Sequence, residues 1–210
     1  EYDALYDELV KLEKETGVIH SYSPTQRVGG KILDKFEKHT HLGELWSLDK
    51  SQSYGELRNW NARVVKLIEE YNNTHEDKLP EPSYVVEYKF DGLTINITYR
   101  DGELTQGATR GNGITGEAIL PQIKTIKTLP LKIHYKGTME VQGEGLMPLS
   151  ALEKYNETAE EPLKNARNAA AGALRNLDPK VTAKRNLTAY FYNIGYIEGK
   201  EFETHIEMLE

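Results

Sequence analysis

One short segment, residues 87–92 (EYKFDG), combines side chains that could do covalent chemistry. Lys89 follows a β-rich run and stands two residues before an aspartate that precedes a glycine. An amine is a nucleophile only after it has lost its proton, which burial or neighbouring cations favour. Gly92 would turn the chain and let a ligand approach the backbone. By itself the pattern fits a structural lysine at a strand end equally well, so other segments must decide.

Two further segments could contact a nucleotide. In residues 108–113 (ATRGNG), Arg110 stands between a strand end and two glycines, which suits a guanidinium aimed at phosphate or ribose oxygens. In residues 140–144 (EVQGE), alternation places the three polar side chains on one strand face. These glutamates could accept hydrogen bonds from ribose hydroxyls or hold a metal. The alternatives are an ordinary Asn-Gly turn and the solvent face of a sheet.

The charged and aromatic residues are each compatible with either a ligand-binding or a purely structural role. The formal net charge is −7, which argues against a dedicated nucleic-acid binder. Residues 162–186 nevertheless carry six basic side chains and one acidic one, which indicates a phosphate-facing strip or a solvated helix face. Tyr190 and Tyr192 share a face of a later strand, where either could stack on a purine or pack in the core. The pair His39 and His41 is interpreted as surface.

Composition bounds the class of protein. The chain has 210 residues, 38% hydrophobic and 28% charged, and a mean hydropathy of −0.63, which allows one large globular domain with a core, or one such domain with a small appendage. The absence of cysteine excludes disulfides and thiolate zinc sites. Apolar runs stay well short of the about 20 residues of a transmembrane helix, and acidic residues crowd the start in place of a signal peptide. We therefore expect no membrane partner, and the absence of cysteine is compatible with a reducing, intracellular location.

Periodicity and turn signals predict an α+β chain with much antiparallel sheet. Ser53 and Glu56 form a capping box at the start of one helix, and Asp101-Gly102 is a hairpin signal. A boundary is expected near residue 80, between a helical front and a strand-rich body, and residues 111–116 are expected to form a loop. Helices are predicted over residues 2–15, 53–72, 149–156, 165–176 and 205–210, and strands over 84–88, 93–99, 103–109, 138–146 and 187–194.

Four blocks, in this order, resemble the adenylation region of the bacterial NAD-dependent DNA ligases over nearly the whole chain. They are SPTQRVGG (23–30), YKFDG (88–92), ATRGNGITGE (108–117) and NARNAAAGALRNLDPKVTAKRN (165–186). ATP-dependent ligases and capping enzymes share the lysine block but, as a rule, not the alanine-rich one. The resemblance implies an α+β nucleotidyltransferase domain, ATP-grasp-like, with antiparallel sheets. Residues 1–22 would be the remnant of a nicotinamide-binding helical subdomain, and residues 23–210 a C-terminally incomplete adenylation domain.

The resemblance also implies a reaction. Lys89 would attack the α-phosphorus of NAD, forming lysyl-AMP and releasing nicotinamide mononucleotide (NMN), with Mg²⁺ screening the phosphates. The AMP would pass to a DNA 5′-phosphate, and a 3′-hydroxyl would displace it and seal the nick. Asp91 would orient the lysine, and no protein metal ligand is implied. The remaining implied contacts are Tyr2 and Asp3 to nicotinamide; Glu87, Tyr192, Ser47 and Leu48 to adenine; Arg110 and Glu144 to ribose and phosphate; and Arg167 and Arg175 to DNA.

A ligase of this family implies NAD and nicked double-stranded DNA as partners, and a role in DNA replication and in repair of DNA damage. It further implies a monomer in the bacterial cytoplasm, associated with the nucleoid. Later motifs and further domains of the family fall outside this chain. We therefore expect the chain to be a fragment that does not seal nicks by itself.

The chain departs from the family pattern at Gln142, where arginine is usual, at Asn112, where aspartate is usual, at Ala166, where proline is usual, and in residues 41–50 (HLGELWSLDK). These departures leave open a degenerate nucleotide-binding paralogue with little catalysis. A second alternative is a nucleotidyltransferase that uses ATP or GTP, against which the nicotinamide-subdomain remnant and the residue 23–30 block speak. A structural interaction protein would leave Lys89 unexplained.

Overall fold

The computed structural model of the chain describes residues 2–27, 33 and 35–210, and only the backbone of Tyr2 and Asp3. The chain divides into two compact units, residues 1–45 with 89–210 and residues 46–88. The predicted division at residue 22 stays a prediction, and the end of the predicted 23–30 block lies outside the described residues. In the described part of the chain, no helix has the length and apolarity that crossing a membrane requires.

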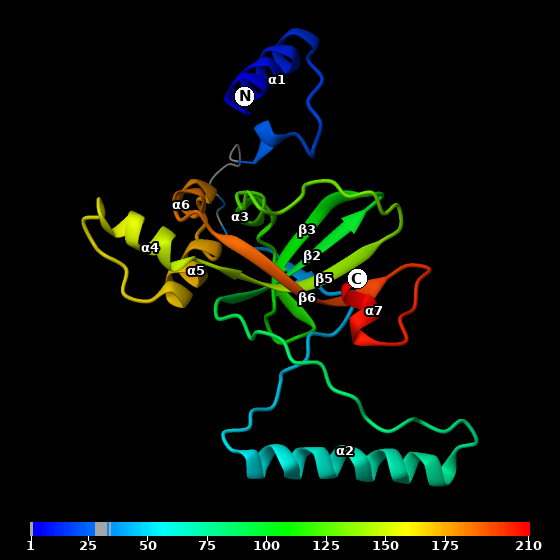
Figure 1. Ribbon diagram of the computed structural model, residues 1–210. Helices are drawn as coiled ribbons and strands as arrows, with labels where there is room; N and C mark the ends of the chain where they lie inside the picture. Colours follow the sequence, from blue (N-terminus) through cyan, green and yellow to red (C-terminus); the bar gives the residue numbers. More distant parts are fainter. Residues whose placement is uncertain (1, 28–32, 34) are drawn as a thin grey trace. The chain divides into compact units, whose positions relative to one another are not determined.

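The larger unit is built around a four-stranded antiparallel sheet with the strand order β3-β2-β5-β6 (Figure 1). The predicted hairpin joins β2 to β3, where Asp101 and Gly102 have positive φ angles of 49° and 80°, as a type I′ turn requires. The predicted α+β chain with antiparallel sheet is therefore confirmed. The strands are β2 (Leu93–Arg100), β3 (Glu103–Thr109), β5 (Met139–Leu146) and β6 (Thr188–Ile197).

A second, two-stranded sheet was not predicted. Strand β1 (Lys38–Thr40) pairs antiparallel with β4 (Thr115–Glu117), with His39 opposite Gly116. β4 occupies the end of the loop that was expected at residues 111–116. A three-residue strand is too short to show an alternating pattern, so only its distant partner reveals it.

The two faces of the large sheet differ in chemistry. Ile95 and Ile97 of β2 are completely buried on the apolar face, in one core cluster with Ala170 and Leu174 of α5. The opposite face carries a row of polar side chains that are also buried. This row consists of Asn96 and Thr98 on β2 and Glu140, Gln142 and Glu144 on β5. The solvent-face alternative for residues 140–144 is therefore wrong.

Helices of the larger unit agree with most of the predictions. Helix α6 begins at Pro179 with Asp178 as its N-cap; it was not predicted because six residues give no clear periodicity. Helices α3, α5 and α6 contact one another, and α5 contacts β2 and β5. The helices are α1 (Tyr2–Thr16), η1 (Pro24–Gln26), α3 (Leu120–Ile123), α4 (Leu149–Asn156), α5 (Ala166–Leu174), α6 (Pro179–Lys184) and α7 (His205–Leu209).

The strand predicted over residues 84–88 is wrong. The structure describes this whole segment and assigns no strand there, and the Val86 side chain is 96% exposed. β-rich composition reports how well side chains pack on a neighbouring strand rather than an intrinsic backbone preference. Without a neighbouring strand, the composition of this segment is not enough to form one.

The smaller unit, residues 46–88, contains helix α2 (Tyr54–Thr74). Its predicted capping box is confirmed: the Ser53 side chain accepts a hydrogen bond from the Glu56 amide at 3.2 Å, and the Glu56 carboxylate accepts one from the Gln52 amide at 2.6 Å. None of the described side chains of α2 is buried. Every described side chain of this helix is therefore at least partly exposed.

We predict that the Ile97→Ala variant loses about 2–5 kcal/mol of unfolding free energy, because it leaves a cavity where a completely buried side chain packs. Ile114→Ala is the matched control, since the Ile114 side chain is 56% exposed and its loss should change the free energy by less than about 0.5 kcal/mol. Urea denaturation followed by circular dichroism measures both. Equal effects of the two substitutions would contradict the assignment of the core.

Candidate active site

A cavity of about 680 Å³ opens at one end of the large sheet, all of it within the larger unit. It is lined by residues from β1, β2, β3, β4, β5 and α5 and from the loop after β3. Four of the predicted site residues line it, namely Arg110, Glu144, Arg167 and Arg175. Lys38, Thr94, Asn112 and Glu117 line it as well.

Glu144 ties the predicted lysine segment to the sheet. Its carboxylate is 9% exposed and accepts a hydrogen bond from the Gly92 amide at 3.1 Å. Thr94, directly opposite on β2, also hydrogen-bonds to it. Burial raises the pKa of Glu144, while these hydrogen bonds and the charges of Lys89 and Arg167 oppose that rise. Lys89 therefore acts electrostatically on this carboxylate.

The residues around Lys89 are held on two sides. The Asp91 carboxylate pairs with the Arg167 guanidinium at 2.8 Å, and the Phe90 ring stacks on Tyr190 with a centroid distance of 4.5 Å and an interplanar angle of 9°. Lys89 itself is exposed. The amine of Lys89 is thus accessible to a ligand, between two neighbours that each contact another part of the larger unit.

Two glycines permit close backbone approaches around the cavity. A Cβ at Gly92 would lie 2.2 Å from the Gly145 carbonyl oxygen, and one at Gly116 would lie 1.7 Å from the Thr109 carbonyl oxygen. Gly92 was expected to turn the chain and admit a ligand to the backbone. In the structure its missing side chain also makes room for the backbone of β5.

Arg110 follows β3 and begins a tight turn. Its carbonyl oxygen accepts a hydrogen bond from the Gly113 amide at 3.0 Å. Asn112 closes the same turn, because its side-chain oxygen accepts hydrogen bonds from the amides of Ile114 at 3.0 Å and Thr115 at 2.8 Å. An aspartate oxygen would accept the same two bonds, so the departure at position 112 leaves the turn unchanged. The predicted turn is therefore present and Arg110 also lines the cavity, whereas its contact with ribose or phosphate stays a prediction.

The two arginines predicted to face DNA are partnered within the chain. Arg167 pairs with Asp91, and Arg175 donates to Glu117 at 2.9 Å and 3.5 Å. Both line the same cavity as Arg110. Contact of Arg167 and Arg175 with DNA stays a prediction.

Tyr192 lies beside the carboxylate at the centre of the site. The Tyr192 side chain hydrogen-bonds to Thr94, and burial together with the Glu144 charge raises the pKa of its phenol. The pairing of β5 with β6 shifts register between Gln142 and Gly143, which gives the strand a local irregularity next to Tyr192. Stacking of the Tyr192 ring on adenine stays a prediction.

Several predicted site residues are not brought to this cavity by the described contacts. Ser47, Leu48 and Glu87 belong to the unit of residues 46–88, and their contact with adenine stays a prediction. The side chains of Tyr2 and Asp3 lie outside the described residues.

The departures at Gln142 and Ala166 also have local explanations. Gln142 is 4% exposed, accepts a hydrogen bond from the Asn193 side chain at 2.8 Å and donates one to the Glu44 carbonyl oxygen at 3.4 Å. Ala166 is the first residue of α5, a position that suits proline and that alanine, the best helix former, also fills well. Neither residue leaves an unmet requirement in the fold.

His41 was interpreted as a surface residue, and this is wrong, because it is 8% exposed. Among the residues that the structure describes, His39, His41 and Glu140 have potential metal-ligand atoms within 4.8 Å of one another. Hydrogen bonds already engage the His41 ring on both nitrogens and the Glu140 carboxylate on backbone amides. A cation would have to displace these bonds, so the trio does not form an open ligand set.

Among the cavity residues to which sequence reasoning gave no role are Lys38, Thr94 and Glu117. Thr94 could have been found, since its place in the predicted hairpin puts it on the same sheet face as Glu144 if the neighbouring strand is known. Glu117 lies within a block that was recognised as a whole. Lys38 carries no local signal, because its strand is paired only by a segment far along the chain.

Comparison with known proteins gives a family. A family model described as NAD-dependent DNA ligase adenylation domain matches residues 33–210. The chain is 58% identical over 210 residues to a DNA ligase of Finegoldia magna and 59% identical over 210 residues to one of Alkaliphilus metalliredigens. A DNA ligase of Clostridium tetani is also 59% identical over the same length. These alignments cover 100% of this chain but 31–32% of the relatives, so the chain spans about a third of their length.

We predict that Glu144 makes stability depend on pH. Because the folded chain raises the pKa of Glu144 above its usual 4.5, the folded state binds this proton more tightly than the unfolded state. Its contribution to the unfolding free energy therefore falls as the pH rises from below 4.5 through the raised pKa. The free energy of the unsubstituted chain minus that of Glu144→Gln should decrease over this window and then level off.

Urea denaturation at a series of pH values measures this difference. Glu153→Gln, at an exposed position on α4, is the control for the substitution itself. A difference for Glu144→Gln that stays constant with pH, or that rises, would contradict the burial of this carboxyl.

Proposed function

The chain belongs to the family of NAD-dependent DNA ligase adenylation domains, and on this premise we propose that Lys89 takes up AMP from NAD. The observation that carries the proposal is the arrangement around one cavity of about 680 Å³. Arg110 and Glu144 line this cavity, and the charge of Lys89 acts on the Glu144 carboxylate. A nucleophilic amine, a phosphate-binding guanidinium and a hydrogen-bond acceptor for ribose are the groups that this chemistry needs.

In the proposed reaction the lone pair of the deprotonated Lys89 Nζ forms a bond to the α-phosphorus of NAD. The bond from that phosphorus to the bridging oxygen breaks, and the electron pair leaves on the phosphate of NMN. The exposed amine gives up one proton to solvent water, and the product is a lysyl-AMP phosphoramidate. Because the transferring group carries negative charge throughout, catalysis depends on alignment and on fixed positive charges.

The arginines of the cavity supply those charges. Arg110 is placed by its turn, whereas Arg167 and Arg175 are paired with Asp91 and Glu117. All four members of these pairs are more than a third exposed, and exposed ion pairs contribute only about 0–1 kcal/mol. A phosphate, which accepts two hydrogen bonds from one guanidinium, can therefore recruit either arginine at low cost.

Magnesium is assigned to the substrate in this proposal. The carboxylates of Asp91, Glu117 and Glu144 are each engaged by an arginine or by a backbone amide. They do not form the open set of oxygen ligands that a resident Mg²⁺ needs, and Mg²⁺ commonly binds through substrate phosphates.

The later steps belong to the whole ligase, of which this chain is about a third by comparison with its relatives. AMP would pass from Lys89 to the 5′-phosphate of nicked double-stranded DNA, and the 3′-hydroxyl would then displace AMP and form the phosphodiester bond. Tyr2, Asp3, Ser47, Leu48 and Glu87 would complete the NAD site. Such an enzyme would act as a monomer at the bacterial nucleoid during DNA replication and repair.

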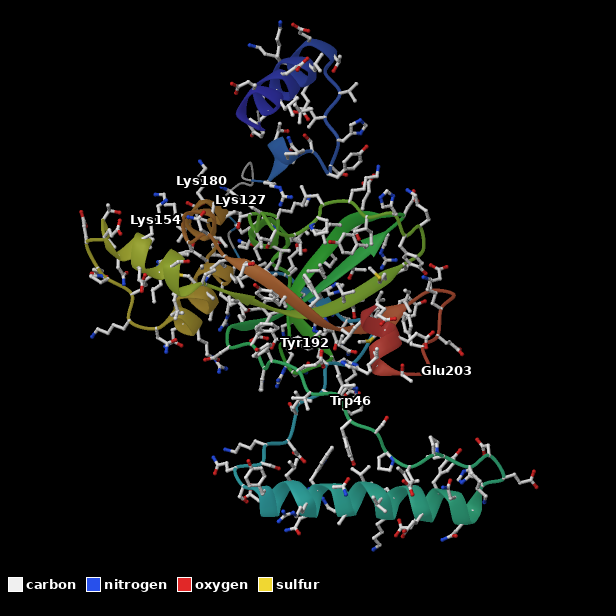
Figure 2. All side chains as sticks on the ribbon, viewed as in Figure 1. Trp46, Lys127, Lys154, Lys180, Tyr192 and Glu203 are labelled. Atoms are coloured by element: carbon white, nitrogen blue, oxygen red, sulfur yellow. The ribbon has the colours of Figure 1, made fainter. Side chains whose placement is uncertain are left out.

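We expect the purified chain to gain the mass of one AMP group when it is incubated with NAD and Mg²⁺, and to lose this gain in Lys89→Ala. Lys127→Ala is the matched control, because Lys127 is also exposed and lies away from Tyr192 (Figure 2). Intact-mass spectrometry reads the adduct, with ATP in a parallel incubation.

An adduct that persists in Lys89→Ala would overturn the assignment of the nucleophile, and an adduct formed from ATP would favour the ATP-using alternative. If the chain forms no adduct, the same incubation with the full-length parent protein decides whether the protein forms lysyl-AMP at all. Absence of an adduct there would favour the degenerate nucleotide-binding paralogue.

A second expectation concerns the adenine ring. Tyr192→Ala should weaken AMP binding by about tenfold or more, because an aromatic–base stack contributes about 1–3 kcal/mol, whereas Tyr192→Phe should retain most of the affinity. Tyr196→Ala, on the same strand at an exposed position, should have no effect. Isothermal titration calorimetry with AMP measures all three, and an equal loss in the phenylalanine and alanine variants would rule out stacking as the role of Tyr192.

A further inference from the structure

We propose that His41 is a positioning residue for Arg110, and that its neutral imidazole fixes where the Arg110 guanidinium meets the phosphates of the ligand. This inference rests on the proposed function, since it concerns the same cavity. His41 does not line that cavity. It contacts the backbone carbonyl of Arg110, and Arg110 is the residue that lines the cavity.

The imidazole lies between two partners that are far apart in the sequence. Its Nε2 atom is 3.1 Å from the Arg110 carbonyl oxygen, and its Nδ1 atom is 2.9 Å from the side-chain amide nitrogen of Asn96. Asn96 belongs to the central strand β2 and is 2% exposed. The ring therefore connects the turn that carries Arg110 to a buried residue on an inner strand of the sheet.

The chemistry of these partners fixes the tautomer. A carbonyl oxygen can only accept, so the proton must be on Nε2, which donates to Arg110. Nδ1 then keeps its lone pair and accepts from the Asn96 amide. The Arg110 carbonyl accepts a second bond, from the Gly113 amide at 3.0 Å, so both of its lone pairs are used.

The backbone reinforces the same connection. The His41 amide donates to the Ile114 carbonyl oxygen at 2.9 Å, and the Leu45 amide donates to the Gly113 carbonyl oxygen at 2.9 Å. The His41 ring also touches Gly116, where an added Cβ would lie 3.2 Å from its Cε1 atom. Backbone bonds hold the turn as a whole, and the side-chain bond is the one aimed at the peptide of Arg110 itself.

Two conservative substitutions separate the two hydrogen bonds of the ring. In His41→Gln the side-chain amide stands near the place of Nε2 and can still donate to Arg110. In His41→Asn the side chain ends near the place of Nδ1 and can still accept from Asn96, but it no longer reaches Arg110. His134→Asn, at an exposed position, controls for the loss of a histidine.

The measurement is AMP affinity by isothermal titration calorimetry on the whole chain, with thermal unfolding of each variant in parallel. We expect His41→Asn to bind AMP about tenfold more weakly than the unsubstituted chain, and His41→Gln to recover most of that loss at a similar unfolding temperature. Arg110→Ala should weaken AMP binding as well, and His41→Asn should add little to it because both act on one contact.

Several outcomes would overturn the inference. One is a loss in His41→Gln as large as in His41→Asn, which would make the role of His41 purely structural, and another is full additivity with Arg110→Ala. A spectroscopic test needs no variant: long-range ¹H–¹⁵N spectra of the unsubstituted chain should show His41 neutral with its proton on Nε2. A proton on Nδ1 would contradict the geometry on which the proposal depends.

These readouts are independent of the reaction. AMP binding and the tautomer of His41 can be measured even if the chain forms no lysyl-AMP. Absence of the AMP adduct in mass spectrometry would therefore count against the proposed function. The role of His41 would still be decided by AMP affinity and by the tautomer.

Discussion

A fully buried carboxylate constrains the geometry of the cavity. The Glu140 side chain has no exposed surface, and it accepts hydrogen bonds from the amides of Leu42 and Gly43 at 3.0 Å. A buried charge without partners would cost several kcal/mol, so the segment that supplies these amides has to stay over the polar face of the sheet. The same segment bonds to the turn after β3 through Leu45 and Gly113. The position of Arg110 therefore depends on the burial of Glu140 through two successive sets of hydrogen bonds, from Glu140 to this segment and from the segment to the turn.

The polar face of the sheet changes character along its length. At one end Glu140 is enclosed and satisfied by backbone amides, and in the middle Gln142 bonds to the neutral Asn193. At the other end Glu144 meets the cavity, where burial raises its pKa and the Lys89 charge opposes the rise. Alternate side chains of β5 are thus a carboxylate enclosed by backbone amides, a neutral amide, and a carboxylate that lines the cavity. The difference between the two glutamates lies in their surroundings, since the side chains are chemically identical.

Local signals in the sequence were reliable where the structure is also local. The Asp101-Gly102 turn and the capping box of α2 are confirmed, because each depends on residues a few positions apart. The strand expected over residues 84–88 failed, because a strand requires a neighbour that composition cannot show. The pairing of β1 with β4 was missed for the converse reason: both strands are too short to be recognised before they are paired. The departures at Asn112 and Gln142 became interpretable only when their hydrogen-bond partners were known.

The sequence by itself determined the α+β class, the family and the residues whose types suit nucleotidyl transfer, above all Lys89, Arg110 and Glu144. These follow from composition, from periodicity and from ordered blocks, which are properties of the chain read in one dimension. Only the tertiary structure decided that His41 is buried behind Arg110 and that Asp91 is paired with Arg167. Hydrogen bonds and ion pairs act over about 3 Å, and only folding brings residues that are tens of positions apart to that distance.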